Sequence, residues 1–282
     1  MNRFVTLDNS RTLRTRPFRH PAIALLIALT FFAAWAHSVT QQAGGRLFAV
    51  IGIATEIAPV EARLMGATIN RIQGIVFTFG TIDGTRIVAV RSGVGKVSAA
   101  MAATLLLDHH APSAVVFSGT AGAVDVELEP GDVVIGTGVG YHDYGNVTVD
   151  GLIRTPTRDY ASGRIDPAFF PAGADLLAAA RKASETMKAM RIRQGLIVTG
   201  DAFMSNPAHR TELRRALNAV AVEMEGAAVA QVCMRFGVPA IVIRGITDRA
   251  DGNASQSYTK FRDTAARNAA DLAVATIREF AK

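Results

Sequence analysis

Four carboxylates stand where apolar segments of this sequence end. Glu223 and Glu225 lie in VAVEMEGAAVAQ, a run that otherwise consists of apolar and small residues. Glu56 follows the apolar run RLFAVIGIA, and Asp248 ends the run AIVIRGITD. Any one of these acids alone is typical of a helix cap or a surface charge. Four acids at the ends of buried segments indicate a site, because charged groups are rarely buried without a partner or ligand. Such a set can perform acid–base catalysis and hold the hydroxyls of a sugar.

Motifs for other chemistries are incomplete in this sequence. The Gly93–Lys96 segment lacks the first glycine of a phosphate-binding loop and is followed by Val97, so we expect a tight strand-to-helix turn. The glycine-rich residues 136–140 precede no helical pattern, and no G-x-S-x-G elbow is present. The six histidines lack metal-ligand spacing. His142-Asp143 is more typical of a structural hydrogen bond than of catalysis. We therefore expect neither a metal ion nor a cofactor.

Alternating strands and helices must position the acids. We expect strands at 46–54, 74–79, 85–91, 113–119, 195–199 and 240–248, and a strand running into a loop within 131–143. Expected helices are 56–65 (capped by Thr55), one that Pro112 ends, 172–190, 223–236 and 257–281. Residues 146–170 are expected to form a long surface excursion.

This alternation predicts an α/β fold with a largely parallel sheet between helical layers. Sites in such sheets lie at the carboxyl ends of strands. The residues at those ends are Thr55-Glu56, Thr120-Ala121-Gly122, Asp201-Ala202-Phe203 and Thr247-Asp248.

The first 36 residues have the three parts of a secretory signal peptide. Five arginines precede the uncharged run 21–36, which ends in Ala34-Trp35-Ala36. We expect a signal peptide at 1–36, a linker at 37–45, a single domain at 46–282 and an exported, periplasmic protein. The alternative is an uncleaved N-terminal membrane anchor facing the periplasm.

The leader also accounts for most of the positive charge of the chain. Without its five Arg and one Asp, 25 basic and 23 acidic residues remain, so the net charge falls from +6 to +2. This balance gives little reason to expect a nucleic-acid partner. Cys233 is the only cysteine, which excludes an internal disulfide, and its apolar surroundings favour a small buried side chain.

From Leu47 to the C-terminus the chain resembles the 5′-methylthioadenosine/S-adenosylhomocysteine nucleosidases of the nucleoside phosphorylase superfamily. The stretches that carry the resemblance are IATEIAPVEARL, SGVGKVSAAMAATLLLDHHAPSAVVFSGTAGAV, PGDVVIG with YHDYG, TGDAFMSNP, AVEMEGAAVAQVC and VIRGITDRAD. The resemblance implies a three-layer αβα sandwich with a central mixed, largely parallel sheet. It also implies a homodimer in which the partner closes part of each site, and hydrolysis of the N-glycosidic bond of an adenine nucleoside.

The resemblance gives each acid a role. Asp248 is expected to be the general acid that protonates adenine N7, and Glu56 the base that orients and deprotonates the attacking water. Glu225 is expected to hold the ribose hydroxyls, with Met224 beneath the sugar. Glu223 is expected to support the site by hydrogen bonds to neighbouring backbone or to Arg244.

Further site residues follow from the same resemblance. Arg244 is expected to help place the water and the ribose. In Thr120-Ala121-Gly122 the threonine shares that role, and the two small residues let the backbone approach the ligand. Phe203 is expected to stack on adenine, the backbone of Met204 to read the edge of the base, and Phe261 to line the pocket for the 5′ substituent.

Departures from the family pattern bear on the nucleophile and on the 5′ group. Phe117 and Ser118 stand where phosphorylases of the superfamily carry a phosphate-binding arginine, and Glu56 places negative charge there. Both features favour water over phosphate. The loop YHDYGNVTVDGLIRTP departs most, so the 5′ substituent stays open. Alternatives are a phosphate-dependent phosphorylase, a non-catalytic nucleoside-binding protein and, for an anchored chain, an enzyme acting on a lipid-linked adenosine.

Overall fold

The computed structural model describes residues 45–159 and 161–282, and the chain from Arg46 to Lys282 forms one unit. The strands are β1 (Leu47–Gly52), β2 (Met65–Ile72), β3 (Ile75–Ile82), β4 (Thr85–Arg91), β5 (Ala114–Ala123), β6 (Val133–Tyr141), β7 (Gly145–Thr148), β8 (Gly151–Arg154), β9 (Phe170–Pro171), β10 (Ile192–Thr199), β11 (Ala219–Glu223) and β12 (Ala240–Asp248). The helices are α2 (Ala54–Glu61), α3 (Lys96–His110), α4 (Ala174–Glu185), α5 (Pro207–Leu217), α6 (Gly226–Phe236) and α7 (Ala254–Ala281).

One mixed sheet runs through the centre of the molecule. Its order is β11-β10-β6-β12-β5-β1-β4-β3-β2, with β9 beside β6. The pairs β1–β4, β1–β5 and β5–β12 are parallel, whereas β6–β12 and the hairpins β2–β3 and β3–β4 are antiparallel. β11 pairs with both β10 and β5, so β5, β12, β6, β10 and β11 close into a ring.

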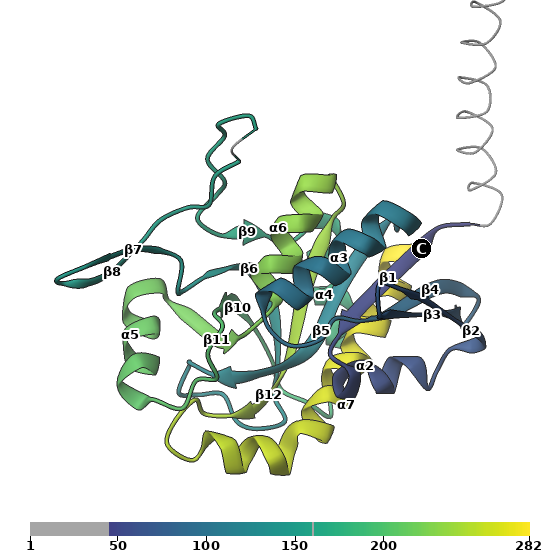
Figure 1. Ribbon diagram of the computed structural model, residues 1–282. Coiled ribbons are helices and arrows are strands. Elements are labelled where there is room, and N and C mark those ends of the chain that lie inside the picture. The colour runs from purple at the N-terminus through teal and green to yellow at the C-terminus, as the bar shows by residue number, and fades with distance from the viewer. Residues whose placement is uncertain (1–44, 160) are drawn as a thin grey trace, which may run out of the picture. The chain divides into compact units, whose positions relative to one another are not determined.

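Helices cover both faces of this sheet (Figure 1). On one face, the alanine- and leucine-rich side of α3 packs with α6 over Phe77, Phe117 and Val134. On the other face, α2, α4 and α7 pack over Phe48 and Val116. The central strands β1 and β5 are buried on both sides, as their continuous apolar runs predict. The expected three-layer αβα arrangement is therefore confirmed.

Several elements differ from the expectation. The segment 223–236 is divided, because Glu223 ends β11 and the helix α6 begins at Gly226. β2 and α5 were not expected, and β2 begins at Met65, where the first helix was expected to end. Thr55 is not a cap, since α2 begins one residue earlier and its N-cap is Ile53. α7 begins at Ala254, three residues before the expected start.

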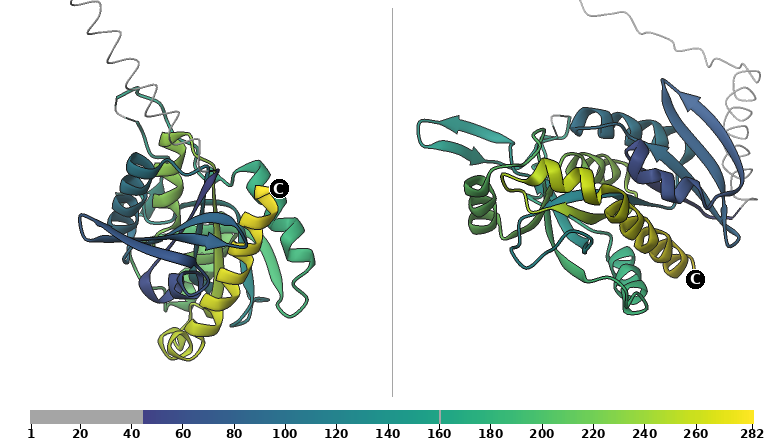
Figure 2. Two further views of the ribbon diagram at one scale, coloured as in Figure 1. Left: turned by 90° about the vertical axis from the view of Figure 1, so that its right-hand side faces the viewer. Right: turned by 90° about the horizontal axis from the view of Figure 1, so that it is seen from below.

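The excursion after β6 projects from the body of the molecule as the β7–β8 hairpin (Figures 1 and 2). The segment that follows the hairpin is fastened to α6. Buried Asp166 accepts hydrogen bonds from the Thr157 hydroxyl (2.7 Å) and from Arg235 Nη2 (2.8 Å). The expected surface excursion is thus present, and its base is held by a buried carboxylate.

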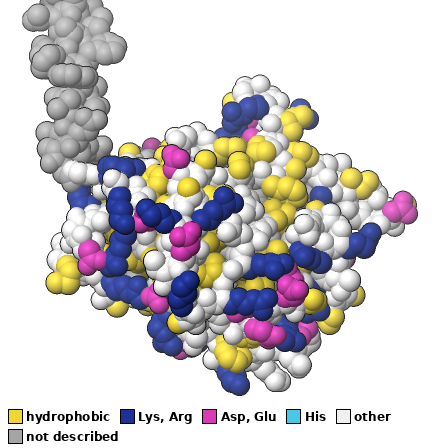
Figure 3. Space-filling model, turned by 180° about the vertical axis from the view of Figure 1, so that it is seen from behind, with side chains coloured by type: hydrophobic (Ala, Val, Ile, Leu, Met, Phe, Trp, Pro, Cys, Tyr) yellow, Lys and Arg dark blue, Asp and Glu magenta, His cyan; other side chains and the backbone are white. Residues whose placement is uncertain are grey.

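The surface carries charges of both signs. Figure 3 shows one face, on which Lys and Arg side chains are interspersed with Asp and Glu. Surface ion pairs include Arg63–Asp271, Lys182–Glu279 and Arg278–Asp83. Within residues 45–159 and 161–282, none of the helices is both long and apolar enough to span a bilayer. The expected signal peptide, and the expected linker up to residue 44, lie outside the described residues.

Candidate active site

A cavity of about 340 Å³ opens where the expected strand ends converge. Its walls come from the loop after β1 with the first turn of α2, the loop after β4, the end of β5, the loop after β10, the β11–α6 junction, the end of β12 and the first turns of α7. The described residues that line it are Ile53, Glu56, Val94, Thr120, Ala121, Gly122, Ala202, Phe203, Met204, Val222, Glu223, Met224, Glu225, Thr247, Asp248, Ser255 and Tyr258.

Ten of the twelve expected site residues line this cavity. The exceptions are Arg244 and Phe261. Arg244 is completely buried behind the wall, where it contacts the carboxylates of Glu56, Glu223 and Glu225. Phe261 is absent from the lining, and Tyr258, one turn earlier on α7, stands in the wall instead. The structure therefore places Tyr258, and not Phe261, in the wall of this cavity.

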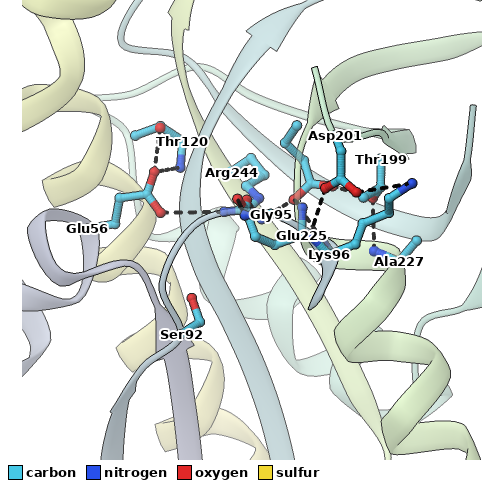
Figure 4. A network of polar contacts seen from close by, with 12 residues as sticks. Glu56, Ser92, Gly95, Lys96, Thr120, Thr199, Asp201, Glu225, Ala227 and Arg244 are labelled. Carbon is cyan, nitrogen blue, oxygen red and sulfur yellow. Dashed lines mark hydrogen bonds and ion pairs between the residues drawn. The ribbon is translucent and has the colours of Figure 1, made fainter. Parts of the chain in front are cut away.

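The guanidinium of Arg244 lies among three carboxylates (Figure 4). It pairs with Glu223, lies 3.5 Å from Glu225 Oε2 and lies 3.7 Å from Glu56 Oε2. Its Cζ stands 4.2 Å from the ring centroid of Phe117. One buried cation thus offsets part of the charge of three acids and fixes their relative positions.

Glu56 is held at one wall by Thr120. Its Oε1 accepts hydrogen bonds from the Thr120 backbone N–H (2.9 Å) and hydroxyl (2.5 Å). Its Oε2 is buried and accepts no hydrogen bond from a described residue. Burial raises the pKa of Glu56, although the charge of Arg244 and the Thr120 hydrogen bonds oppose the rise. Oε2 instead lies on the Arg244 side of the carboxyl group, 3.7 Å from Arg244 Nη1.

Glu223 and Glu225 differ sharply in their surroundings. Glu223 Oε2 accepts hydrogen bonds from the backbone N–H groups of Glu225 (3.1 Å) and Gly226 (2.7 Å), and Oε1 accepts one from Thr199. Hydrogen bonds to neighbouring backbone, as expected for Glu223, are thus present. Glu225 Oε1 accepts one from the Gly95 backbone N–H (2.8 Å). Burial and the nearby charge of Glu223 raise the pKa of Glu225 to about 7, despite the opposing charge of Arg244.

Asp248 is positioned at the end of β12 by two short hydrogen bonds. Its Oδ2 accepts from the Thr247 hydroxyl (2.7 Å), and its Oδ1 accepts from the Ala250 backbone N–H (2.8 Å). Burial raises its pKa even though both hydrogen bonds favour the ionised form. A carboxyl group with a raised pKa keeps its proton closer to neutral pH, as a general acid requires.

The mouth of the cavity is aromatic. Phe203 is 48% exposed and meets Tyr258 edge to face, with ring centroids 5.9 Å apart. Such a half-exposed ring beside an open cavity can stack on a planar ligand. Across the described residues, no three His, Cys, Asp or Glu side chains converge as metal ligands do.

Sequence reasoning gave no site role to several lining residues besides Tyr258, namely Ile53, Val94, Ala202, Val222, Thr247 and Ser255. Ala202 and Thr247 belong to strand ends that had been singled out. The helical spacing of Ser255 and Tyr258 (i, i+3) places them on one face of α7, and an earlier helix start would have revealed it.

Comparisons with known proteins agree with this architecture. Residues 47–278 match the model of the phosphorylase superfamily. The 5′-methylthioadenosine/S-adenosylhomocysteine nucleosidase of Geobacillus kaustophilus is 39% identical over 234 residues, which cover 81% of this chain and 95% of the relative.

Two solved structures share the fold over nearly their full length. The 5′-methylthioadenosine/S-adenosylhomocysteine nucleosidase of Neisseria meningitidis, in complex with methylthio-immucillin-A, has a TM-score of 0.74 and 35% identity, and the match covers 83% of this chain and 99% of that one. The futalosine hydrolase of Helicobacter pylori has a TM-score of 0.72 and 27% identity, with 83% and 98% covered. The chain therefore belongs to the phosphorylase superfamily and, within it, to the 5′-methylthioadenosine/S-adenosylhomocysteine nucleosidases, which are N-glycosyl hydrolases.

Proposed function

We propose that the protein hydrolyses the N-glycosidic bond of 5′-substituted adenosines, such as methylthioadenosine and S-adenosylhomocysteine, and releases adenine and the ribose derivative. The observation that carries this proposal is that Glu56, Glu225 and Asp248 face one cavity from three separate walls. Each has a distinct hydrogen-bonding environment. Three acids held apart in this way can serve as base, sugar ligand and acid in one reaction.

Asp248 supplies the proton for the leaving base. Its carboxyl transfers a proton to N7 of adenine while the bond between C1′ and N9 breaks and its electron pair moves onto the base. Thr247 and Ala250 hold both oxygens, which fixes the direction of the transfer. The ribose is left with positive charge at C1′, and the surrounding carboxylates stabilise that charge.

Glu56 acts on the water that attacks C1′. The Glu56 carboxylate, which lines the cavity, takes the proton of the water as the new C1′–O bond forms. Thr120 orients its Oε1, and Arg244 holds the group in place from behind. Residues on opposite sides of the reacting carbon thus carry the two proton transfers.

The rest of the cavity binds the nucleoside. Glu225 accepts hydrogen bonds from the ribose diol, Met224 packs beneath the sugar, and Phe203 stacks on the adenine with the Met204 backbone at its edge. Tyr258 lines the space left for the 5′ substituent. The half-exposed state of Phe203 and the aromatic pair that it forms with Tyr258 support this arrangement.

Water is a better nucleophile than phosphate for this cavity. Of the described residues that line it, none is Lys or Arg, and the buried Arg244 is already engaged by carboxylates. A phosphate dianion would meet Glu56 with like charge. The phosphorylase alternative therefore lacks a cationic subsite.

The decisive experiment measures free adenine. The purified, metal-free protein is incubated with methylthioadenosine, S-adenosylhomocysteine, adenosine and inosine, with and without phosphate, and the released base is followed by chromatography. Adenine release without phosphate is the expected result, and the series ranks the 5′ groups. Release only with phosphate would establish the phosphorylase alternative. Tight binding without any release would establish a nucleoside-binding protein.

We infer that the protein is a homodimer. Val94, Val97 and Met101 are 59%, 81% and 45% exposed at the start of α3, and Val94 also lines the cavity. An apolar face beside a site is typical of an interface. Light scattering should give twice the mass of one chain, and Val97→Glu should give the mass of a monomer.

We also infer export, with residues 1–36 as the signal peptide and 46–282 as the catalytic domain. The basic leader, the apolar run and the small-residue cleavage site support this inference. The mature protein should be periplasmic and should begin at His37 by mass spectrometry. A full-length mass in the membrane fraction would establish the anchored alternative.

A further inference from the structure

The ammonium group of Lys96 ties together three loops beside the cavity. Its Nζ donates to Asp143 Oδ1 (2.9 Å) and Oδ2 (2.8 Å), and it lies 3.5 Å from Asp201 Oδ2. Lys96 opens α3 after β4, Asp143 follows β6, and Asp201 follows β10. The three side chains are only partly exposed, at 24%, 31% and 47%. We name Lys96, Asp143 and Asp201 the lysine clamp.

Two backbone N–H groups of the lysine clamp also donate hydrogen bonds to its carboxylates. The Lys96 N–H donates to Asp201 Oδ1 (2.8 Å), and the Asp201 N–H donates to Asp143 Oδ2 (2.9 Å). Burial alone would raise the pKa of Asp143, but the hydrogen bonds from Lys96 and Asp201 outweigh it and lower that pKa. Asp143 therefore stays ionised at a lower pH than an ordinary aspartate does.

The lysine clamp is connected through Asp201 to the aromatic mouth of the cavity. Asp201 directly precedes Ala202, Phe203 and Met204, all of which line the cavity. Phe203 is 48% exposed, so core packing does little to fix its position. At the β10 end this loop is restrained by the hydrogen bonds of Asp201 and by the one that the Gly200 N–H donates to the Glu223 carbonyl (3.0 Å).

The lysine clamp is also connected to Glu225, through the residue that precedes Lys96. Gly95, next to Lys96 in the chain, donates its N–H to Glu225 Oε1 at 2.8 Å (Figure 4). Gly95 has a φ of +86°, and a Cβ at this position would lie 3.1 Å from Asp201 Oδ1. The backbone at Gly95 is thus fitted between Glu225 on one side and the clamp on the other.

From these contacts we propose that Lys96 is a positioning residue, which holds the Phe203 loop and the Gly95 N–H in the places where adenine and ribose are bound. The proposal rests on the proposed function for the identity of the ligand, but not for the geometry. Lysine suits this place because its three donors can bond two carboxylates at once. Sequence analysis had assigned the Gly93–Lys96 segment only to a tight turn.

The test compares Lys96→Met, which removes the charge but keeps the length, with Lys96→Arg. The matched control is Lys182→Met, which removes the ion pair between Lys182 on α4 and Glu279 on α7, outside the cavity. For Lys96→Met we expect kcat/KM for methylthioadenosine to fall by about 10- to 100-fold, because a displacement of about 1 Å can cost that much. Lys96→Arg should retain a large part of the wild-type kcat/KM, and Lys182→Met should have the wild-type kcat/KM.

The pH profile separates positioning from a general loss of structure. The Gly95 N–H favours ionised Glu225. Lys96→Met should therefore move the acidic limb of the kcat/KM profile to higher pH, while Lys182→Met should leave it in place. Asp143→Asn should move the limb in the same direction. The double variant Lys96→Met/Asp143→Asn should be no worse than the single ones, because residues that act as one unit are not additive.

Hydrogen exchange tests the geometry without any turnover. In Lys96→Met, amides of residues 93–96 and 201–204 should exchange faster than in the wild type, while those of β12 should not change. Unchanged exchange in both segments, or an unchanged acidic limb in an active Lys96→Met, would overturn the proposal. A wild type that releases no adenine would instead refute the proposed function, and the exchange experiment would still decide on the clamp.

Discussion

Gly119 leaves the space that the guanidinium of Arg244 occupies. A Cβ at Gly119 would overlap with Arg244 Nη1 and with Glu56 Oε2, both of which are buried. The glycine is therefore required by the charged cluster and not by a turn. The two residues are paired in register across β5 and β12, so the guanidinium crosses directly over the neighbouring strand.

Gly119→Ala should damage stability and activity together. Overpacking a filled interior costs about 1–3 kcal/mol, which corresponds to a fall in Tm of several degrees for a chain of this size. Because Arg244 and Glu56 must move, kcat/KM should fall by at least about 10-fold. The control is Gly252→Ala, where a Cβ has no heavy atom within 4 Å. Wild-type kinetics in Gly119→Ala would contradict the role given to the cluster.

Asp248→Asn should abolish turnover and leave binding largely intact. The amide keeps the shape of the side chain but has no proton to give to the base, so kcat should fall by about 10²- to 10⁴-fold. Single-turnover adenine release measures the chemical step, and calorimetry with adenine measures binding. If more than about a tenth of kcat remained, Asp248 would not be the general acid.

Glu225→Gln should make the protein more stable at alkaline pH. Glu225 has a pKa of about 7 in the folded chain, whereas an unfolded glutamate has about 4.3. The folded state therefore retains a proton between these values that the unfolded state releases, and the contribution of Glu225 to stability is lost as pH rises through 7. Gln removes this loss, which is on the order of 4 kcal/mol as an upper limit.

The measurement for Glu225→Gln is the free energy of unfolding by urea at pH 4.5 and at pH 8. Relative to the wild type, the free energy of unfolding of Glu225→Gln should be higher at pH 8 than at pH 4.5. The exposed control Glu185→Gln should show no such difference. Equal behaviour of both variants at the two pH values would show that Glu225 does not carry a buried charge.

Acid–base roles also predict the shape of the activity profile. Burial raises the pKa of Glu56 and of Asp248 above the usual carboxyl range. The base must be ionised and the acid protonated. The acidic limb of kcat/KM should therefore lie above the ordinary glutamate pKa, and Asp248→Glu should displace the alkaline limb. An acidic limb at or below the ordinary value would argue against Glu56 as the base.

Tyr258 and Phe261 give opposite predictions although one helical turn separates them. Tyr258→Leu removes an aromatic wall of the cavity, so KM for methylthioadenosine should rise by about 10-fold. Phe261 lies outside the described lining, so Phe261→Leu should change KM by less than about twofold. A large effect in Phe261→Leu alone would restore the assignment made from the sequence.

The sequence predicted the location of the site well, because one physical rule governs it. Parallel strands point their carboxyl ends to the same edge, so Glu56, Thr120 and Asp248 had to lie near one another once their strands were identified. Long apolar runs identify such strands without knowledge of their neighbours. The same reasoning placed Phe203 at the site, since it follows β10.

Elements that depend on distant partners could not be predicted in this way. β2 is exposed along nearly its whole length and is stabilised by pairing with β3, so it has no apolar alternation. α5 buries only Leu213 and therefore lacks a periodic apolar face. Glu223 was assigned to a helix because small residues surround it, whereas pairing of β11 with β10 and β5 keeps it extended.

The closed ring of strands also determines when the site can form. β5 ends at Ala123, but its ring partners β11 and β12 begin only at Ala219 and Ala240. Contacts between segments so far apart in the sequence form late in folding, because bringing their ends together costs chain entropy. A growing chain on the ribosome consequently has no assembled site until almost all of it has emerged. A chain kept unfolded for passage across a membrane would likewise consume no nucleoside before it arrives.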